Sequence, residues 1–188
     1  MRILAALLTL SLISAGPADD GRFYAGDYSF SDELGGFRIL SVTGSGTKAD
    51  PIEIHEELNS ASPVTLVIRA ARPIQHHGFP EGAFHLRVVT FNKSGLAWIE
   101  FEFELQETLG KPSDFYDGLS FDQTNPNPDL ISSNRFARFE NHFEKFDRLR
   151  FASGHVDPLD GPAFGFFITD VTPVTEFYLV QDPRVPFS

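Results

Sequence analysis

The chain contains no cysteine. This absence excludes disulfide bonds, cysteine-ligated zinc, iron–sulfur clusters and cysteine nucleophiles. It also excludes attachment to a membrane through a lipid-modified N-terminal cysteine. A domain of this size does not need disulfide bonds, because its hydrophobic core can supply enough stability.

Basic residues are scarce relative to acidic ones. The 188 residues include 15 lysines and arginines against 26 aspartates and glutamates, which gives a net charge of −11. Nucleic acids and anionic membranes attract basic proteins, so this balance argues against both as partners. Cations and neutral ligands fit the composition better.

Long hydrophobic runs are also absent. The apolar segment Ile3–Ile13 has 11 residues, well short of the ~20 that a membrane-spanning helix needs. It follows Arg2 and precedes a run of small residues that ends at Ala18, an arrangement typical of a cleaved export signal. We therefore expect residues 1–18 to be removed, with Ala15 as the alternative cleavage position. The remaining residues, 19–188, then form one domain in the periplasm or outside the cell, without a membrane span.

Phenylalanine, proline and glycine are all plentiful, with 20, 13 and 15 residues. Aromatic residues favour strands, and closely spaced prolines and glycines end strands after short runs. Residues 97–106 alternate with period two, which places Phe101 and Phe103 on one side and Trp98 with the glutamates on the other. Ile99 is expected beside the phenylalanines. Similar patterns predict strands at 22–30, 37–43, 51–57, 64–70, 83–91, 147–152, 163–169 and 176–181. The expected fold is all-β: a single antiparallel β-sandwich of about nine strands, jelly-roll or immunoglobulin-like.

Three segments depart from simple alternation. Residues 134–146 carry four phenylalanines at helical spacing, although a strand followed by a loop also fits them. At Val88-Val89 the alternation slips by one residue, which predicts a β-bulge. Residues 110–133 form the longest expected loop, and loops of this length are often functional.

Two segments carry a resemblance to known proteins. One is Pro112-Ser-Asp-Phe-Tyr-Asp-Gly-Leu-Ser-Phe-Asp-Gln123. The other is Phe151-Ala-Ser-Gly-His-Val-Asp-Pro158 with the strands 164–170 and 177–181 that follow. They resemble an uncharacterised family of exported bacterial β-sandwich proteins, over roughly residues 44–183. The resemblance implies export and a sandwich fold, and it brings no functional residue to this chain.

Glu100, Glu102 and Glu104 share one face of the strand predicted at 97–106, about 6.5–7 Å apart along it. Their pattern, E-F-E-F-E followed by Leu, resembles the E-I-D-F-E-F-L strand of jelly-roll glycosidases of the laminarinase and xyloglucan-transferase clan. The resemblance implies a nucleophile at Glu100, a tuning carboxyl at Glu102, where that clan has Asp, and an acid/base at Glu104. Trp98 on the same face could stack on a sugar ring, so Trp98, Glu100 and Glu102 are the candidate ligand-binding residues. The alternative is a solvated strand face without catalysis.

Oxygen-bearing side chains are concentrated in the loop at 110–133. The Asn-x-Asn-x-Asp run at 125–129 has the first ligand spacings of an EF-hand, but Leu130 stands where that motif requires glycine. An irregular calcium site remains compatible with the ligand types, and its candidate ligands are Asp114, Asp117, Asp122 and Asp129. Asx turns in a polar loop explain the same residues without a metal. No cofactor other than calcium is indicated.

A local basic cluster lies at 135–150, with Arg135, Arg138, Lys145, Arg148 and Arg150. Such a cluster could bind an acidic polysaccharide or a partner protein, or pair with neighbouring carboxylates. Asn92-Lys-Ser94 matches the sequon for N-glycosylation. Serine-nucleophile and phosphate-binding motifs are absent.

The sequence therefore favours a non-catalytic extracytoplasmic binding or structural module. Its expected ligand is a polysaccharide or a cell-surface protein. The alternative hypothesis is a glycoside hydrolase or transglycosylase that uses Glu100, Glu102 and Glu104.

Overall fold

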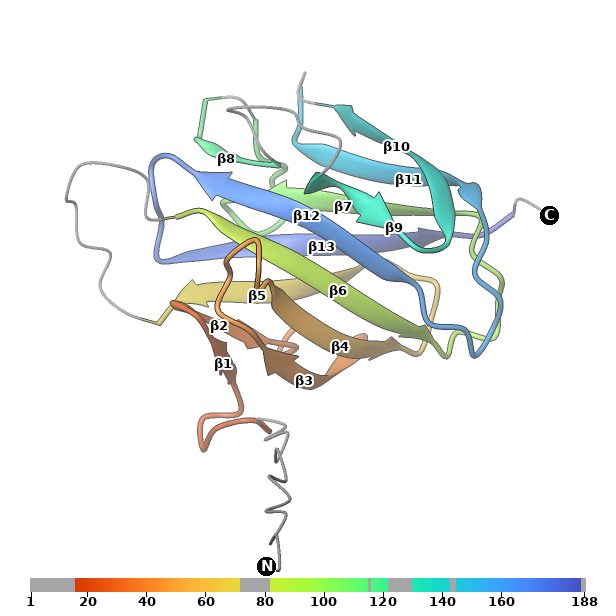
Figure 1. The fold of residues 1–188 in the computed structure, drawn as a ribbon, viewed down its shortest axis with the longest axis horizontal. Helices are drawn as coiled ribbons and strands as arrows, with labels where there is room; N and C mark the ends of the chain where they lie inside the picture. Colours follow the sequence, from red (N-terminus) through yellow and green to blue (C-terminus); the bar gives the residue numbers. More distant parts are fainter. Residues whose placement is uncertain (1–15, 72–81, 115, 122–129, 143–144, 187–188) are drawn as a thin grey trace, which may run out of the picture.

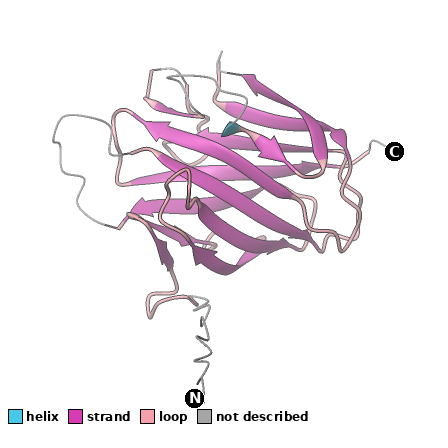
Figure 2. Ribbon diagram, viewed as in Figure 1, coloured by secondary structure: helices cyan, strands magenta, loops and turns pink. Residues whose placement is uncertain are grey.

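The structure, a computed structural model, describes residues 16–71, 82–114, 116–121, 130–142 and 145–186. Strands dominate this part of the chain (Figure 2), and its one helical residue, Leu130, is of the 3-10 type rather than α-helical. The all-β prediction is therefore confirmed. The predicted export signal falls largely outside the described residues.

Thirteen strands are present in the described residues. In chain order they are β1 (Phe23–Ala25), β2 (Tyr28–Ser31), β3 (Phe37–Thr43), β4 (Ile52–Leu58), β5 (Val64–Ala70), β6 (Phe84–Asn92), β7 (Glu100–Gln106), β8 (Leu119–Ser120), β9 (Ser132–Ser133), β10 (Phe136–His142), β11 (Arg148–Gly154), β12 (Ala163–Asp170) and β13 (Glu176–Arg184). The expected nine strands were too few. The segment at 22–30 is divided at Gly26, whose positive φ of 56° turns the chain between β1 and β2. The other additions are β8, β9 and β10.

The strands form two sheets, neither of which closes into a barrel (Figure 1). One has seven strands in the order β1-β2-β5-β13-β7-β11-β10, and the other has the order β3-β4-β6-β12-β8, with β9 also paired to β12. The named strands pair antiparallel, as expected, except for β4 and β6, which are parallel. Between these two strands the chain passes through β5 in the other sheet, so β6 returns in the same direction as β4.

The two sheets share one hydrophobic core. Strand β7 illustrates how the sequence builds it: Phe101, Phe103 and Leu105 are fully buried, while the glutamates between them are partly exposed. Phe103 contacts Phe164 and Phe166 of the facing sheet, at ring-centroid distances of 5.2 and 4.8 Å. Phenylalanines from both sheets thus interlock, as period-two alternation requires.

For residues 134–146 the sequence was compatible with either a helix or a strand, and the structure contains a strand, β10. Phe139 lies opposite Phe151 of β11, and Phe136 lies opposite Gly154. Between these pairs Ser153 has a φ of 60°, in the left-handed region that non-glycine residues seldom adopt. We attribute the helix-like spacing to this irregularity, because it lets both phenylalanines face the core.

The bulge predicted at Val88-Val89 is also wrong. Strand β6 pairs with β4 and β12 in continuous register, and its buried and partly exposed residues alternate throughout. The hydrophobic pattern slips because Thr90, a polar residue, occupies a fully buried position. The register shift that the structure does contain lies in β3, between Ile39 and Ser41.

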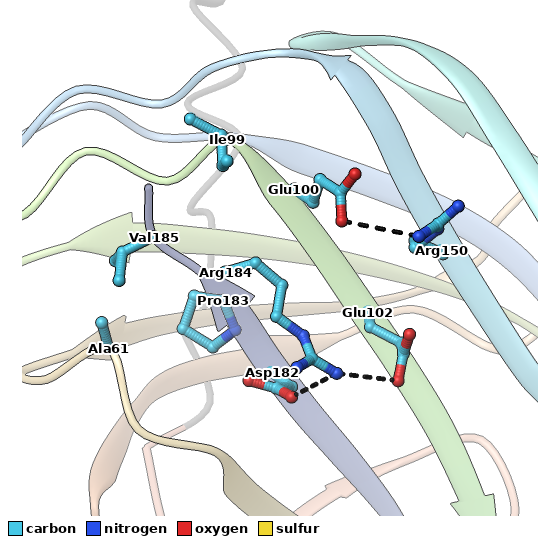
Figure 3. A pocket seen from close by; sticks show the side chains of 9 residues that line it. All are labelled: Ala61, Ile99, Glu100, Glu102, Arg150, Asp182, Pro183, Arg184 and Val185. Carbon is cyan, nitrogen blue, oxygen red and sulfur yellow. Dashed lines mark hydrogen bonds and ion pairs between the residues drawn. The ribbon is translucent and has the colours of Figure 1, made fainter. Parts of the chain in front are cut away.

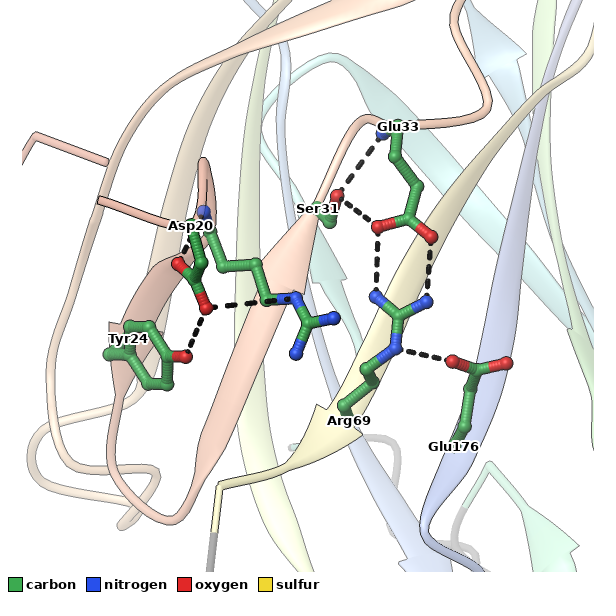
Figure 4. A network of polar contacts seen from close by, with 7 residues as sticks. Asp20, Tyr24, Ser31, Glu33, Arg69 and Glu176 are labelled. Carbon is green, nitrogen blue, oxygen red and sulfur yellow. Dashed lines mark hydrogen bonds and ion pairs between the residues drawn. The ribbon is translucent and has the colours of Figure 1, made fainter. Parts of the chain in front are cut away.

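Within the seven-stranded sheet, a network of polar contacts joins the segment that follows β2 to strands β5 and β13 (Figure 4). Arg69 of β5 donates two hydrogen bonds to Glu33, at 3.0 and 2.6 Å, and its Nε pairs with Glu176 of β13. Ser31 donates to the same Glu33 at 2.8 Å. These bonds lower the pKa of Glu33, the arginine making the larger contribution.

Candidate functional site

The candidate site lies on the outer face of the seven-stranded sheet, over β7, β11 and β13. Glu100, Glu102 and Glu104 point outward from β7 together, so their predicted common face is confirmed. Strand β11 places Arg148 opposite Glu104 and Arg150 opposite Glu102. The face is therefore a set of cross-strand pairs of opposite charge, an arrangement that stabilises neighbouring strands.

The predicted position of Trp98, on the outer face beside the glutamates, is wrong. Trp98 is fully buried, with an exposed fraction of 0%, and does not share the outer face with the glutamates. Its ring packs 5.5 Å from that of Phe101, and its Nε1 donates to Ser94 Oγ at 3.1 Å. The alternation does not extend to Trp98 and Ile99 because β7 begins only at Glu100. Before that strand, Trp98 pairs with Val156 in an isolated β-bridge. Ile99, expected in the core, is exposed instead.

Arginines form ion pairs with the glutamates of β7. Arg148 Nε donates to Glu104 Oε2 at 2.6 Å, and Gln106 Nε2 donates to Glu104 Oε1 at 2.7 Å. Arg150 binds Glu140 at 2.6 Å and lies 3.7 Å from Glu100. Of the two readings of the basic cluster, pairing with neighbouring carboxylates thus accounts for both of these arginines. The closest ion pair of Glu100, at 3.7 Å, is longer than the closest ion pair of Glu102 or of Glu104.

A hollow of about 530 Å³ opens at one end of this face. Its polar lining consists of Glu100, Glu102, Arg150, Asp182 and Arg184, and its apolar lining of Ala61, Ile99, Pro183 and Val185. Figure 3 shows the guanidinium of Arg184 reaching between two carboxylates. It lies 2.9 Å from Asp182 and 3.3 Å from Glu102.

The sequence analysis missed the part of the hollow that β13 contributes. Asp182 and Arg184 lie opposite Glu102 and Glu100 of β7. Burial raises the pKa of Asp182, and the nearby Glu102 and Glu104 raise it further against the lowering effect of Arg184. One signal could have pointed to this strand: Val180, Asp182 and Arg184 alternate, so they share a face. Only the sheet order reveals that the face adjoins β7.

Of the four candidate calcium ligands, Asp114 and Asp117 lie in the described residues. Asp114 accepts a hydrogen bond from Tyr116 N, and Asp117 accepts from Asp114 N and Leu119 N, which are local turn contacts. Asp122 and Asp129 lie outside the described residues. Within the part of the chain that the structure describes, no group of three or more His, Asp or Glu side chains could hold a metal ion.

One buried carboxyl lies near this loop. Asp147 accepts a 2.7 Å hydrogen bond from Ser120 Oγ, and its other oxygen has no partner. Burial raises the pKa of Asp147 to about 6, and the charges of Asp117 and Asp114 contribute to the increase. The sequence offered no sign of this, since the partner strand β8 was not predicted.

The sequon residue Asn92 has a structural role. Its side chain is fully buried and its Nδ2 donates to the carbonyls of Leu96, Val156 and Asp157, at 2.9, 3.4 and 3.3 Å. Its Oδ1 accepts from Ser94. In the folded protein this amide is inaccessible to a modifying enzyme.

Two further findings bear on function. None of the described segments is a helix that combines the length and hydrophobicity needed to cross a membrane. Comparison with known proteins finds no similarity: no family model, no curated protein and no solved structure matches the chain. The function of the hollow therefore has to be inferred from its own chemistry.

Proposed function

We propose that the protein is a non-catalytic, extracytoplasmic binding module whose hollow holds part of a neutral carbohydrate. The observation that carries the proposal is the lining of the hollow, where ion-paired carboxylates and guanidiniums adjoin apolar side chains. In this proposal the two sheets form a sandwich of jelly-roll or immunoglobulin-like type. The predicted export signal, and the sequence resemblance to exported bacterial proteins, agree with a role outside the cytoplasm.

The charge of the hollow suits a neutral ligand. Three carboxylates and two guanidiniums line it, leaving a formal charge of −1. Carboxylates accept hydrogen bonds from sugar hydroxyls and arginines donate to them, and the ion pairs hold both groups in place before a ligand arrives. A strongly charged ligand would meet one favourable and one unfavourable set of charges.

The apolar lining supplies the second element of carbohydrate recognition. Ile99, which is exposed, and Val185, which is half-buried, offer surface against which the C–H face of a sugar ring can pack. With Trp98 buried, this aliphatic surface takes the place of the aromatic stacking that we expected. The hollow itself requires no cofactor, and calcium at the loop 110–133 stays a separate prediction.

Hydrolysis by Glu100, Glu102 and Glu104 is less well supported. Glu104, the acid/base in that hypothesis, does not line the hollow with the other two. Both of its oxygens already accept hydrogen bonds, from Arg148 and Gln106. A retaining glycosidase needs both carboxyls at the same sugar ring.

The proposal is tested by calorimetric titration of the purified protein with soluble polysaccharides. Neutral glycans such as laminarin and xyloglucan are compared with alginate, an acidic one. Glu100→Gln keeps the shape of the side chain but removes its charge, and we expect it to weaken binding of the neutral glycan about tenfold, the effect of one lost charge-assisted hydrogen bond. Glu53→Gln on β4 is the matched control, because both side chains are 33% exposed and ion-paired with arginine.

Each outcome has a direct reading. Saturable binding of a neutral glycan that Glu100→Gln weakens and Glu53→Gln does not supports the proposal. Equal loss in both variants, or binding of alginate alone, contradicts it. Release of reducing sugar by the wild type, abolished in Glu100→Gln, would replace it with the glycosidase hypothesis.

A further inference from the structure

A carboxyl group lies between the two sheets, away from the hollow. Glu56 belongs to β4, where it follows Ile52 and Ile54 in the inward-facing series, and it is only 1% exposed. Thr90, its neighbour on β6, donates to Glu56 Oε1 at 2.9 Å. Gln181 of β13, in the other sheet, donates to Glu56 Oε2 at 2.9 Å. The three side chains therefore connect the sheets through the core.

We propose that Glu56 is a protonated carboxylic acid in the folded protein in mildly acidic solution, and that Glu56, Thr90 and Gln181 form a pH-sensitive lock between the sheets. The lock is closed while the proton is present and weakens when Glu56 ionises. This proposal concerns the core and is independent of what the hollow binds.

The surroundings of Glu56 favour the neutral form. Both hydrogen-bond donors are uncharged, and the one charged group that acts on Glu56 within the described structure is Asp32, an acid. Asp32 follows β2 and accepts from Ile39 N at 2.9 Å. A buried carboxylate without a cation is costly, so such a group takes up a proton instead. In agreement, burial raises the pKa of Glu56 to about 7, against the lowering effect of its two hydrogen bonds.

An unused acceptor supports the same conclusion. Gln181 is fully buried, and its Oε1 has no hydrogen-bond donor although its Nε2 is bound to Glu56. Buried acceptors without donors are rare in folded proteins. A carboxylate cannot donate, whereas a carboxylic acid adjacent to this amide brings one donor to the group.

The next residue along the chain provides a contrast. Glu57 points to the other side of β4, where its two oxygens lie 3.0 Å from Arg38 and 2.6 Å from Lys93. Its pKa is lowered, chiefly by the hydrogen bond from Lys93. Two consecutive glutamates thus prefer opposite protonation states because one faces the core and the other faces cations.

The direction of the pH effect follows from linkage. A group whose pKa is higher in the folded state takes up protons on folding, so its contribution to stability is greatest at low pH and declines as pH rises. For Glu56 the decline spans the pH interval from 4.5, the ordinary pKa of a glutamate, to about 7, its pKa in the folded protein. Across it the ratio of folded to unfolded protein falls on the order of 100-fold relative to a protein without this titration.

Glu56→Gln tests the proposal, because glutamine imitates the neutral acid in shape and can donate. Urea unfolding of wild type and variant is followed between pH 4.5 and 8.5 by the emission of Trp98, the single tryptophan. We expect the variant to gain stability relative to wild type as pH rises to about 7, and the difference to be constant above that. Other raised carboxyls, such as Asp147, are present in both proteins and cancel in the difference.

Glu57→Gln is the matched control. Because its native carboxyl has a lowered pKa, this substitution should destabilise by a constant amount from pH 5.5 to 8.5. A Glu56→Gln difference that is equally constant across this pH range, whether a gain or a loss, would overturn the proposal.

A second measurement serves if Glu56→Gln does not fold. In wild-type protein with ¹³C-labelled glutamate carboxyls, one resonance should titrate with a midpoint near 7. If every glutamate resonance titrates below pH 6, Glu56 is an ordinary carboxylate and the lock does not exist.

Discussion

The interior of this protein is held together in two different ways. Between β7 and β11 of one sheet and β12 of the other, it is a cluster of phenylalanine rings with Phe103 and Phe164 at its centre. Between β4, β6 and β13 it contains the polar lock of Glu56, Thr90 and Gln181. Both regions join the same two sheets, so they show what aromatic packing and hydrogen bonding each contribute.

The two regions differ in how they respond to conditions. Ring packing stabilises through buried apolar area and dispersion, which do not depend on protonation. A buried carboxyl stabilises only while its hydrogen bonds and protonation state match its surroundings. The aromatic region therefore provides constant stability, and the polar region makes the junction of the sheets depend on pH. Substitutions in each region should separate these contributions.

The largest effect is expected in the aromatic region. Phe103→Ala removes a fully buried ring that contacts Phe101, Phe151, Phe164 and Phe166. Large-to-small substitutions of this kind cost about 3–5 kcal/mol, because they combine lost transfer free energy with a cavity. Urea unfolding should show this loss unchanged between pH 5 and 8. Phe103→Leu, which keeps most of the volume, should lose less than half as much, and a pH-dependent loss would contradict the comparison.

A smaller effect, also independent of pH, is expected at Asn92. It resembles the polar lock in being buried and hydrogen-bonded, but an amide does not titrate in this range. Asn92→Ala removes the side-chain donor that the carbonyls of Leu96, Val156 and Asp157 share. These carbonyls keep their hydrogen bonds from Ser94 Oγ, Trp98 N and Asp160 N, so the expected cost is about 0.5–1.5 kcal/mol.

Asn92→Asp sharpens this test. It retains the oxygen that Ser94 binds but turns a carboxylate toward three carbonyls. We expect it to be less stable than Asn92→Ala at pH 8 and to recover on acidification. Thermal unfolding at both pH values measures the difference, and equal stability of the two variants at pH 8 would show that the carbonyls do not depend on this donor.

Local pattern predicted much of the fold. The alternation at 100–106 correctly placed Phe101 and Phe103 in the core and Glu100, Glu102 and Glu104 outside. Where alternation was broken, the physical cause was hidden in another strand. Thr90 looked like the consequence of a bulge because its partner Glu56 lies 34 residues earlier in the chain.

The candidate site was less predictable than the fold. Its carboxylates were evident, but Asp182 and Arg184 enter through the register of β13 with β7, which no local pattern encodes. The same holds for Trp98, which forms a bridge to Val156, a residue distant in the sequence. Long-range register decides which charges meet, and single-sequence periodicity reports only which side of a strand each charge occupies.

The smallest effect is expected for ion pairs at the surface, which complete the comparison between buried and exposed polar groups. Arg184 is 48% exposed in its pairs with Asp182 and Glu102, whereas Arg69 is 18% exposed between Glu33 and Glu176. Exposed pairs contribute about 0–1 kcal/mol and are screened by salt. Arg184→Gln should therefore cost less stability than Arg69→Gln in low salt, and 1 M NaCl should remove most of the smaller loss. If Arg184→Gln proves the more destabilising, the hollow is a structural element of the sheet rather than a surface available to a ligand.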